Sequence, residues 1–190
     1  EPPLPALLCS CGLDFRVFGD RYTKVSSRFQ QSPQDPSMPE VRNHTFDELS
    51  IGQRAESSRT VTMEDVRLFA AASGDHNPLH LDPAYAASTR FGGCIAHGMF
   101  SGGLISAVLA MQMPGPGTIY LGQSLTFRLP VKIGDTLTVQ LTVADKEPRR
   151  RHVTLDCLVL NQHGKKVVTG TAEVIAPAER ETVTIAAAPG

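Results

Sequence analysis

The 190-residue sequence predicts an α+β fold: a single antiparallel sheet of about five strands wrapped around one buried helix. The first observation behind this prediction is an uncharged, largely apolar segment over residues 97–113, which is typical of a helix buried on every side. The second is that apolar and polar residues alternate from there to residue 177, as they do in half-buried strands. A sheet with one apolar face must bury that face, and the helix offers the surface for it.

The two ends of the chain differ in composition from the middle. Residues 1–40 hold six of the fourteen prolines and show no periodicity, so we expect an N-terminal extension that is disordered or of engineered origin. The last residues end in Ala-Ala-Ala-Pro-Gly, which is typical of a linker. We therefore expect one folded domain over residues 41–178, followed by a C-terminal tail or linker over residues 179–190.

Charge and cysteine content exclude several classes of protein. Eighteen basic and nineteen acidic residues give a net charge of −1, which offers no basic surface for a nucleic acid. No stretch approaches the roughly 18 apolar residues that span a membrane. The four cysteines form no Cys-x-x-Cys pair, and reduced thiols in a cytoplasmic protein are the simplest interpretation.

Capping signals mark the helices that precede the buried one. Thr62 to Asp65 resemble a capping box, and apolar residues at helical spacing follow until Gly74 ends the helix. Pro78 cannot continue that helix, so we expect an irregular segment there. A short helix then begins at Asp82-Pro83, because aspartate caps a helix and proline suits its first turn.

The predicted strands follow from the period of two. The clearest spans residues 137–143, where Leu and Val alternate with Thr and Gln. Residues 152–160 and 166–175 predict two more, joined by a turn at 161–164, and a shorter alternation covers 125–129. An earlier strand is expected to end at residues 59–62. A sheet of this size around a buried helix is the hot-dog arrangement.

Two polar clusters lie in otherwise apolar surroundings, and they carry the candidate chemistry. In the first, Asp75 and His80 flank an Asn-Pro bend, which can hold a carboxylate and an imidazole close together for acid–base work. In the second, His97 precedes Gly98 at the start of the buried helix, where free amides and the positive end of the dipole can stabilise a developing oxyanion. Together they suit proton transfer next to a carbonyl.

These clusters resemble the MaoC-like, or (R)-specific enoyl-CoA hydratase, family. The resemblance rests on residues 69–80 (Phe-Ala-Ala-Ala-Ser-Gly-Asp-His-Asn-Pro-Leu-His), on His97-Gly98-Met99 and on residues 115–123 (Gly-Pro-Gly-Thr-Ile-Tyr-Leu-Gly-Gln). It covers about residues 46–176. It implies reversible syn addition of water to trans-2-enoyl thioesters of coenzyme A or acyl-carrier protein, giving (R)-3-hydroxyacyl thioesters.

The resemblance also assigns roles to individual residues. Asp75 and His80 would be the catalytic pair that activates one water, and the backbone amide of Gly98 would hold the thioester oxygen. Asn77 would fix the loop and contribute to the water site, and Ser106 matches a serine that contacts the catalytic aspartate. No cofactor or metal is implied, because coenzyme A is part of the substrate. Similar sequences also occur fused to a phosphate acyltransferase domain.

Other interpretations stay open. A metal could bind His76 and His80, with His97 and Asp75 completing the set, but Pro78 breaks the helical geometry that a His-x-x-x-His site needs. Cys94 could be a nucleophile but lacks a pattern for an orienting base. Arg149 to Arg151 are either solvated turn residues or contacts for coenzyme A phosphates.

Two alternative functions are a hot-dog thioesterase and a non-catalytic thioester-binding domain of a larger fusion. Loss of Asp75 or His80 would mark the latter, and both are present. A single hot-dog unit leaves a sheet edge and one helix face near the surface, so we expect a homodimer with a continuous sheet.

Overall fold

The computed structural model describes residues 39–185. The predicted N-terminal extension therefore lies, up to residue 38, outside the described residues. In chain order the elements are β1 Glu40–Arg42, the 3₁₀-helix η1 Phe46–Glu48, β2 Arg54–Thr60, α1 Met63–Ser73, α2 Pro78–Leu81, α3 Pro83–Ser88, α4 Gly98–Met111, β3 Ile119–Phe127, β4 Thr136–Glu147, β5 His152–Leu160, β6 Lys166–Ile175 and β7 Thr182–Thr184.

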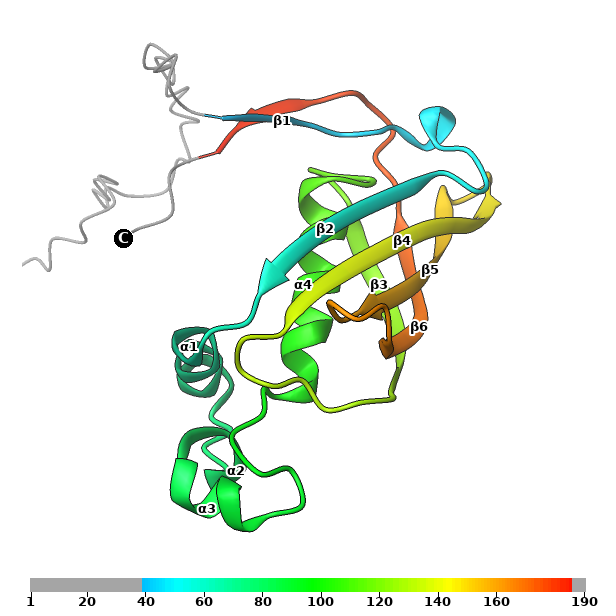
Figure 1. The fold of residues 1–190 in the computed structure, drawn as a ribbon. Coiled ribbons are helices and arrows are strands. Elements are labelled where there is room, and N and C mark those ends of the chain that lie inside the picture. The colour runs from blue at the N-terminus through cyan, green and yellow to red at the C-terminus, as the bar shows by residue number, and fades with distance from the viewer. Residues whose placement is uncertain (1–38, 186–190) are drawn as a thin grey trace, which may run out of the picture. The chain divides into compact units, whose positions relative to one another are not determined.

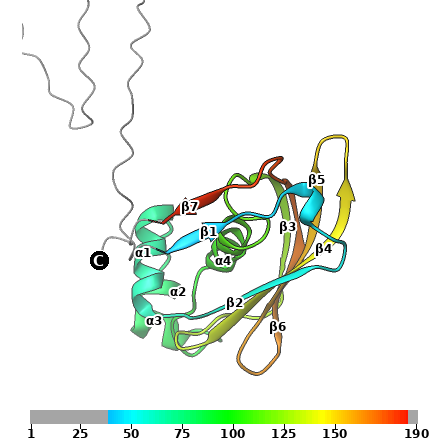
Figure 2. The ribbon, with the colours of Figure 1, turned by 90° about the horizontal axis from the view of Figure 1, so that it is seen from above.

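Five of these strands form one antiparallel sheet in the order β2-β4-β5-β6-β3. The sheet curves around α4, and helices α1 to α3 lie beside the N-terminal end of α4 (Figures 1 and 2). The predicted α+β hot-dog architecture is therefore confirmed. The strands predicted over 152–160 and 166–175 have the bounds of β5 and β6.

Alternation places the core between the sheet and α4. On β5, and on β4 up to Val143, every second residue is buried, and Ile105, Val108 and Leu109 of α4 pack in the same cluster. The strand expected over 125–129 instead spans Ile119–Phe127. A bulge between Tyr120 and Gly122 interrupts its register, which removes the period of two from its first half.

The helix ends mostly follow the predicted caps. Thr62 and Asp65 form the reciprocal capping box of α1, and Gly74 ends it in the left-handed conformation. The irregular segment expected after Gly74 covers residues 74–77, but it ends at Pro78 and not at Asp82, because residues 78–81 form the short helix α2. Pro78 occupies its first turn, where a proline costs no hydrogen bond. Asp82 caps α3 as predicted, by accepting from the amides of Ala84 and Tyr85.

The expectation that α4 is buried on every side is wrong within this chain. Met99, Gly103, Ala107 and Met111 form an exposed stripe along it. Ile119, Leu121 and Phe127 of the neighbouring edge strand β3 are also exposed, the first at 57%. Uniform apolarity indicates that a helix avoids water, but it does not say whether its own sheet or another molecule covers each face.

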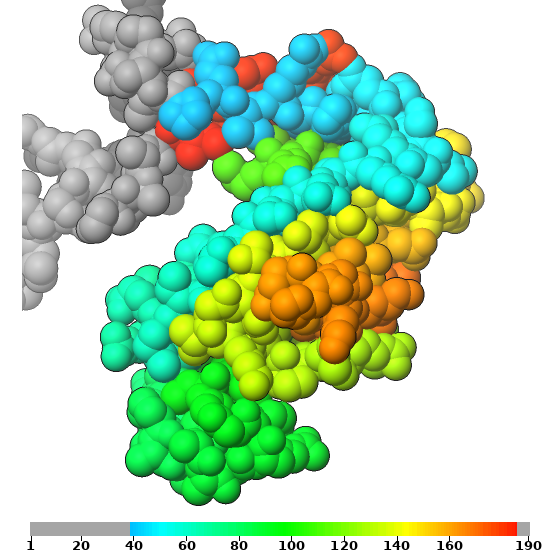
Figure 3. Space-filling model, in the orientation of Figure 1, coloured from blue at the N-terminus to red at the C-terminus, as the bar shows by residue number. Residues whose placement is uncertain are grey.

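A two-stranded clasp joins the ends of the described chain. β1 pairs with β7, so Thr182–Thr184 form a strand where the sequence predicts a linker. Buried Asn43 fastens this clasp, since its amide group donates to the carbonyl oxygens of Pro116 and Glu179 and accepts from the amide of Glu181. In Figure 3 the two strands lie against each other, blue against red.

A membrane span requires a long apolar helix, and a disulfide requires two cysteines close together. Among the described helices, none combines the length and apolarity that crossing a bilayer requires. Cys94 and Cys157 are unpaired thiols, while Cys9 and Cys11 lie outside the described residues. Burial, assisted by the charge of Asp156, raises the pKa of Cys157 to about 12, so that thiol stays protonated.

Candidate active site

The loop between α1 and α2 presents Asp75. Gly74 turns the chain out of α1, with φ of +77°, and the amide of Asp75 then donates to the hydroxyl oxygen of Ser73 at 3.3 Å. The Asp75 carboxylate accepts from the amide of Asn77 at 3.2 Å and is exposed. The side chain is therefore held by its own loop but open to a water or a ligand.

His80 lies on α2, and its ring is buried. Asn77 caps this helix by accepting from the amide of Leu79. Nδ1 of His80 lies 2.7 Å from the carbonyl oxygen of Ile95, and because a carbonyl can only accept, Nδ1 carries the proton. The other ring nitrogen, Nε2, is therefore the basic atom in the neutral ring.

His97 is the residue that brings the loop and the buried helix together. It is the N-cap residue of α4, and only 3% of it is exposed. Its Nε2 donates to the backbone carbonyl of Asp75 at 2.9 Å. Its ring stacks on that of His80, with centroids 3.8 Å apart and planes inclined by 31°.

Asp75, His80 and His97 form a tight cluster, in which one nitrogen or oxygen from each lies within 4.8 Å of the others. Such a set could hold a metal or share a water. In stacked imidazoles the in-plane lone pairs point side by side and not at one metal centre. In addition, Nε2 of His97 already donates a hydrogen bond to the carbonyl oxygen of Asp75. The geometry therefore suits a shared water better than a metal.

Gly98 opens α4 next to this cluster, at the wall of a pocket of about 300 Å³. His80 lines the same pocket, together with Ser101, Phe127, Arg90 and Arg128. As the first residue of a helix, Gly98 has an amide with no partner inside the helix, and it donates to no other acceptor within residues 39–185. This amide can therefore receive a ligand oxygen, as the sequence predicts.

Of the other two predicted site residues, Asn77 lies in the loop near Asp75, whereas Ser106 lies away from Asp75. Asn77 lies in the loop and links it to α2, as described above. Ser106 lies on a half-buried position of α4, about 12 Å along the helix from Gly98 at 1.5 Å per residue. No hydrogen bond joins Ser106 to Asp75 within the described chain, so one subunit does not bring this pair together.

Sequence reasoning missed the aromatic surroundings of the site. Phe69 packs against His97, with centroids 5.0 Å apart, and Phe127 covers Gly98. The helical spacing of Phe69 indicates that it faces inwards, which is the only signal the sequence offers for this contact. The Arg149–Arg151 turn joins β4 to β5 at the end of the sheet opposite to Phe127 and Val168, so it does not line this pocket.

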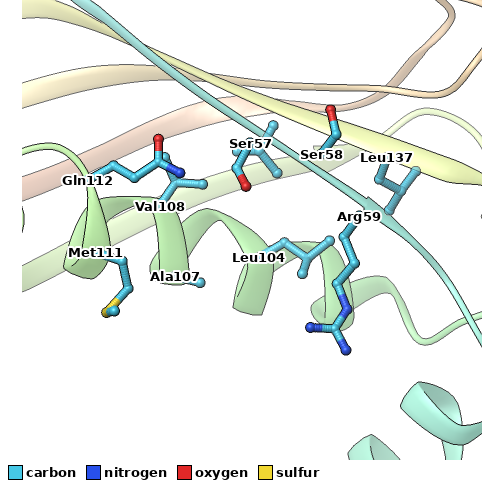
Figure 4. Close-up of a pocket in the computed structure, with 10 residues that line it drawn as sticks. Ser57, Ser58, Arg59, Leu104, Ala107, Val108, Met111, Gln112 and Leu137 are labelled. Carbon is cyan, nitrogen blue, oxygen red and sulfur yellow. The ribbon is translucent and has the colours of Figure 1, made fainter. Parts of the chain in front are cut away.

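A second pocket, of about 320 Å³, lies between β2 and α4 (Figure 4). Apolar side chains of α4, among them Leu104, Val108 and Met111, form one wall, and Ser57 to Arg59 form another. Its single ionisable lining residue, Arg59, is paired with Asp65. This pocket therefore has no counterpart to His80, which lines the other pocket of similar volume.

Known proteins match the described unit over most of its length. Residues 48–163 match the family described as "MaoC like domain". An (R)-specific enoyl-CoA hydratase of Rhodospirillum rubrum is 46% identical over 137 residues, which cover 71% of this chain and 93% of the relative. A 3-hydroxybutyryl-CoA dehydratase of Methylorubrum extorquens is 42% identical, covering 76% of this chain and 91% of the relative.

A solved structure agrees with these sequence matches. The unliganded R-hydratase PhaJ1 from Pseudomonas aeruginosa is 52% identical and superposes with a TM-score of 0.78. The match covers 80% of this chain and 97% of the PhaJ1 chain. The similarity therefore includes both the fold and the segments that build the site.

Proposed function

The chain belongs to the MaoC-like domain family, and from this premise we propose that it is an (R)-specific enoyl-CoA hydratase. It adds water reversibly to the double bond of trans-2-enoyl thioesters and gives (R)-3-hydroxyacyl thioesters. It is a hydro-lyase, so dehydration runs through the same site. The observation that carries the proposal is the cluster of Asp75 and His80 beside the free amide of Gly98.

Asp75 and His80 share the work on one water. Nδ1 of His80 donates to Ile95, which leaves Nε2 to accept a proton from that water as it attacks C3 of the substrate. The carboxylate of Asp75 accepts the second hydrogen bond of the water and orients it. The proton returns to C2 on the same face, because both groups stand on one side of the substrate.

Gly98 stabilises the charge that develops during addition. Attack at C3 moves electron density onto the thioester oxygen and gives an enolate. The free amide at the start of α4, aided by the helix dipole, is positioned to receive that oxygen. No cofactor takes part in this scheme, and the acid–base pair with the amide donor supplies each step.

The exposed apolar face points to a homodimer. Edge strand β2 carries mostly polar residues, whereas β3 exposes Ile119, Leu121 and Phe127 beside the exposed stripe of α4. Pairing β3 with its own copy would continue the sheet across both subunits and cover this surface. The expected homodimer therefore forms through β3 and α4.

The same symmetry gives Ser106 a role. A two-fold axis that pairs β3 antiparallel with its copy also makes the two α4 helices antiparallel. The N-terminal end of one helix, where Asp75 lies, then faces the far half of the other. Ser106 would meet Asp75 of the partner subunit and hold that carboxylate from outside its own loop.

Three further features stay predictions. We predict that the thioester carrier is coenzyme A or acyl-carrier protein and that the protein is cytoplasmic. The third prediction is a fusion of this unit to a phosphate acyltransferase domain. The first can be tested directly by comparing crotonyl-CoA with crotonyl-acyl-carrier protein at matched concentrations.

The experiment for the main proposal follows crotonyl-CoA by the absorbance of its enoyl thioester. We expect that absorbance to fall without release of free thiol, and chiral chromatography to give the (R)-3-hydroxy product. Thiol release would instead indicate the alternative thioesterase. Unchanged absorbance with unchanged thiol would indicate the non-catalytic binding domain, and either result would overturn the hydratase.

A further inference from the structure

The side chain of His97 is held by several contacts next to the site, but it takes no part in the proposed reaction. It is buried, it caps α4 without a side-chain hydrogen bond to the helix amides, and its ring contacts those of Phe69 and His80. It also hydrogen-bonds a residue 22 positions away. An ordinary N-cap residue has none of these long-range contacts.

The hydrogen bond of His97 fixes its tautomer. Nε2 lies 2.9 Å from the carbonyl oxygen of Asp75, which can only accept, so Nε2 carries the proton. Nδ1 is then a bare acceptor, and it is buried without a partner among the described residues. Within residues 39–185 the ring is therefore held by one hydrogen bond and by its contacts with the rings of Phe69 and His80.

These contacts connect the three parts of the site through one side chain. The bond to the Asp75 carbonyl attaches the acidic loop to the residue directly before Gly98. The stacked face sets the plane of the His80 ring, whose other constraint is the bond to Ile95. Phe69, which packs edge-on against Phe100 of α4, also contacts the His97 ring, with the two planes inclined by 43°.

We propose that His97 is a positioning residue for hydration: in its Nε2-protonated form it fixes the spacing between the Asp75 loop, the His80 ring and the Gly98 amide. This inference rests on the proposed function. His97 acts through its neighbours and not on the substrate, because its Nε2 is bonded to the Asp75 carbonyl and only 3% of the residue is exposed. Its loss should therefore lower kcat and leave KM nearly unchanged.

Three substitutions separate the hydrogen bond from the stacking. His97→Phe keeps an aromatic ring of similar size but removes the donor. His97→Gln places an amide nitrogen near the position of Nε2 and can still donate to the Asp75 carbonyl. His97→Asn places its amide near Nδ1 and cannot reach that carbonyl.

We expect His97→Phe and His97→Asn to lower kcat on crotonyl-CoA by about 10- to 100-fold, the size of effect that a misplacement of about 1 Å produces. KM should stay within about threefold, as for an interaction that does not bind the ground state. His97→Gln should recover at least about fivefold of the kcat lost in His97→Asn. The melting temperatures, followed by circular dichroism, should not follow this order.

A readout that does not depend on activity tests the tautomer. Two-bond ¹H–¹⁵N correlation spectra of the protein, labelled on histidine, report which ring nitrogen carries the proton. We expect the His97 signal, assigned by its loss in His97→Gln, to show a protonated Nε2 and a bare Nδ1.

The outcomes distinguish this inference from the proposed function. A wild type without hydratase activity would overturn the proposed function. An active wild type with a normal kcat in His97→Phe would overturn only the positioning role of His97. Equal loss in all three variants, in proportion to lost stability, would also overturn it. So would a spectrum with the proton on Nδ1.

Discussion

The ring of Phe127 lies directly over Gly98, so closely that a Cβ atom added to Gly98 would come within 3.2 Å of Cε1 of Phe127. This contact places the first amide of α4 at the wall of the pocket that also contains His80. A glycine leaves room for a ligand oxygen to approach the amide, and a larger residue would have to displace the Phe127 ring.

The amide of Gly98 can be tested by two substitutions of different chemistry. Gly98→Pro removes the N–H but suits the first position of a helix, and His97 already has the extended conformation that precedes a proline. Gly98→Ala adds a Cβ and keeps the N–H. We expect kcat on crotonyl-CoA to fall about 100- to 1,000-fold in Gly98→Pro.

Gly98→Ala is the steric control, and its loss should be at least about tenfold smaller than that of Gly98→Pro. Circular dichroism checks that the helix persists in both variants. If the two lose the same activity, the pocket wall and not the hydrogen bond is responsible.

Asp75→Asn tests the carboxylate of the catalytic pair. The amide keeps the size of the side chain and can still accept from the backbone of Asn77, so the loop should persist. It cannot act as a base or carry the negative charge that orients the water, and we expect at least a ~100-fold loss of kcat. Because Asp75 is exposed, the melting temperature should change little; near-normal turnover would remove Asp75 from the mechanism.

His80→Gln tests the imidazole. Glutamine cannot take up a proton near neutral pH, so the enoyl absorbance of crotonyl-CoA should fall at least ~100-fold more slowly than in the wild type. His80 is buried and bonded to Ile95, so this variant also loses a hydrogen bond and some packing. Asp82→Asn, in a residue that caps α3 nearby, serves as a control for local disturbance and should keep its activity within about threefold. Equal loss in both variants would contradict a specific role for His80.

The sequence could predict most of the fold, because most of its local signals agree with the final packing. Thr62 and Gly74 bound α1 as their chemistry dictates, and the period of two gave β5 and β6 their correct ends. The clasp of β1 and β7 could not be predicted, since three-residue strands carry no period and pair across more than 130 residues. The fold class predicts that one face of the helix lies near the surface, but it does not identify Met99 and Met111 as part of that face, because an apolar residue covered by a second molecule looks the same in sequence as one in the core.

The site was predictable for a different reason. Asp75 and His80 flank one bend, so local geometry already brings them near each other, whereas Gly98 reaches them through the packing of α4 and is predicted from the motif at the helix start. The stacking of His97 on His80 depends on how α1, α2 and α4 pack, and no local pattern encodes it. For Ser106 the single chain shows no contact with Asp75, so its role depends on assembly.

Leu121→Lys tests the proposed homodimer. Leu121 is exposed on edge strand β3, and a lysine there would place like charges close together on either side of the two-fold axis. We expect the dimer to dissociate, as measured by size-exclusion chromatography with light scattering, and activity to fall with it. Ser58→Lys, on the opposite and polar edge β2, should leave the mass unchanged. A wild type that elutes as a monomer would contradict the dimer.

Asp65→Asn tests the pH dependence of stability. Burial alone would raise the pKa of Asp65, but hydrogen bonds from Thr62 and the guanidinium of Arg59 outweigh it and hold the pKa below 3.8. A carboxyl with a lowered pKa in the folded state stabilises the fold above its unfolded value, and this stabilisation disappears as the pH falls through the folded value.

We therefore expect Asp65→Asn to cost about 1 kcal/mol of unfolding free energy at pH 7, which is typical of a lost helix cap. Urea unfolding of both proteins should show this difference shrinking as the pH falls below about 4. A difference that is the same at pH 7 and at pH 3 would mean that the charge of Asp65 does not contribute.

The clasp has a consequence for how the unit tolerates rearrangement of its backbone. The amide of Ile185 bonds to the carbonyl of Pro39, so the entry and exit points of the folded unit are neighbours in space. A short bridge between them would permit a circular permutant, reopened at the exposed turn of residues 161–164, with every sheet strand intact. By the same geometry, the whole unit can be inserted into a surface loop of a host protein, because its two ends lie close enough to join both sides of that loop.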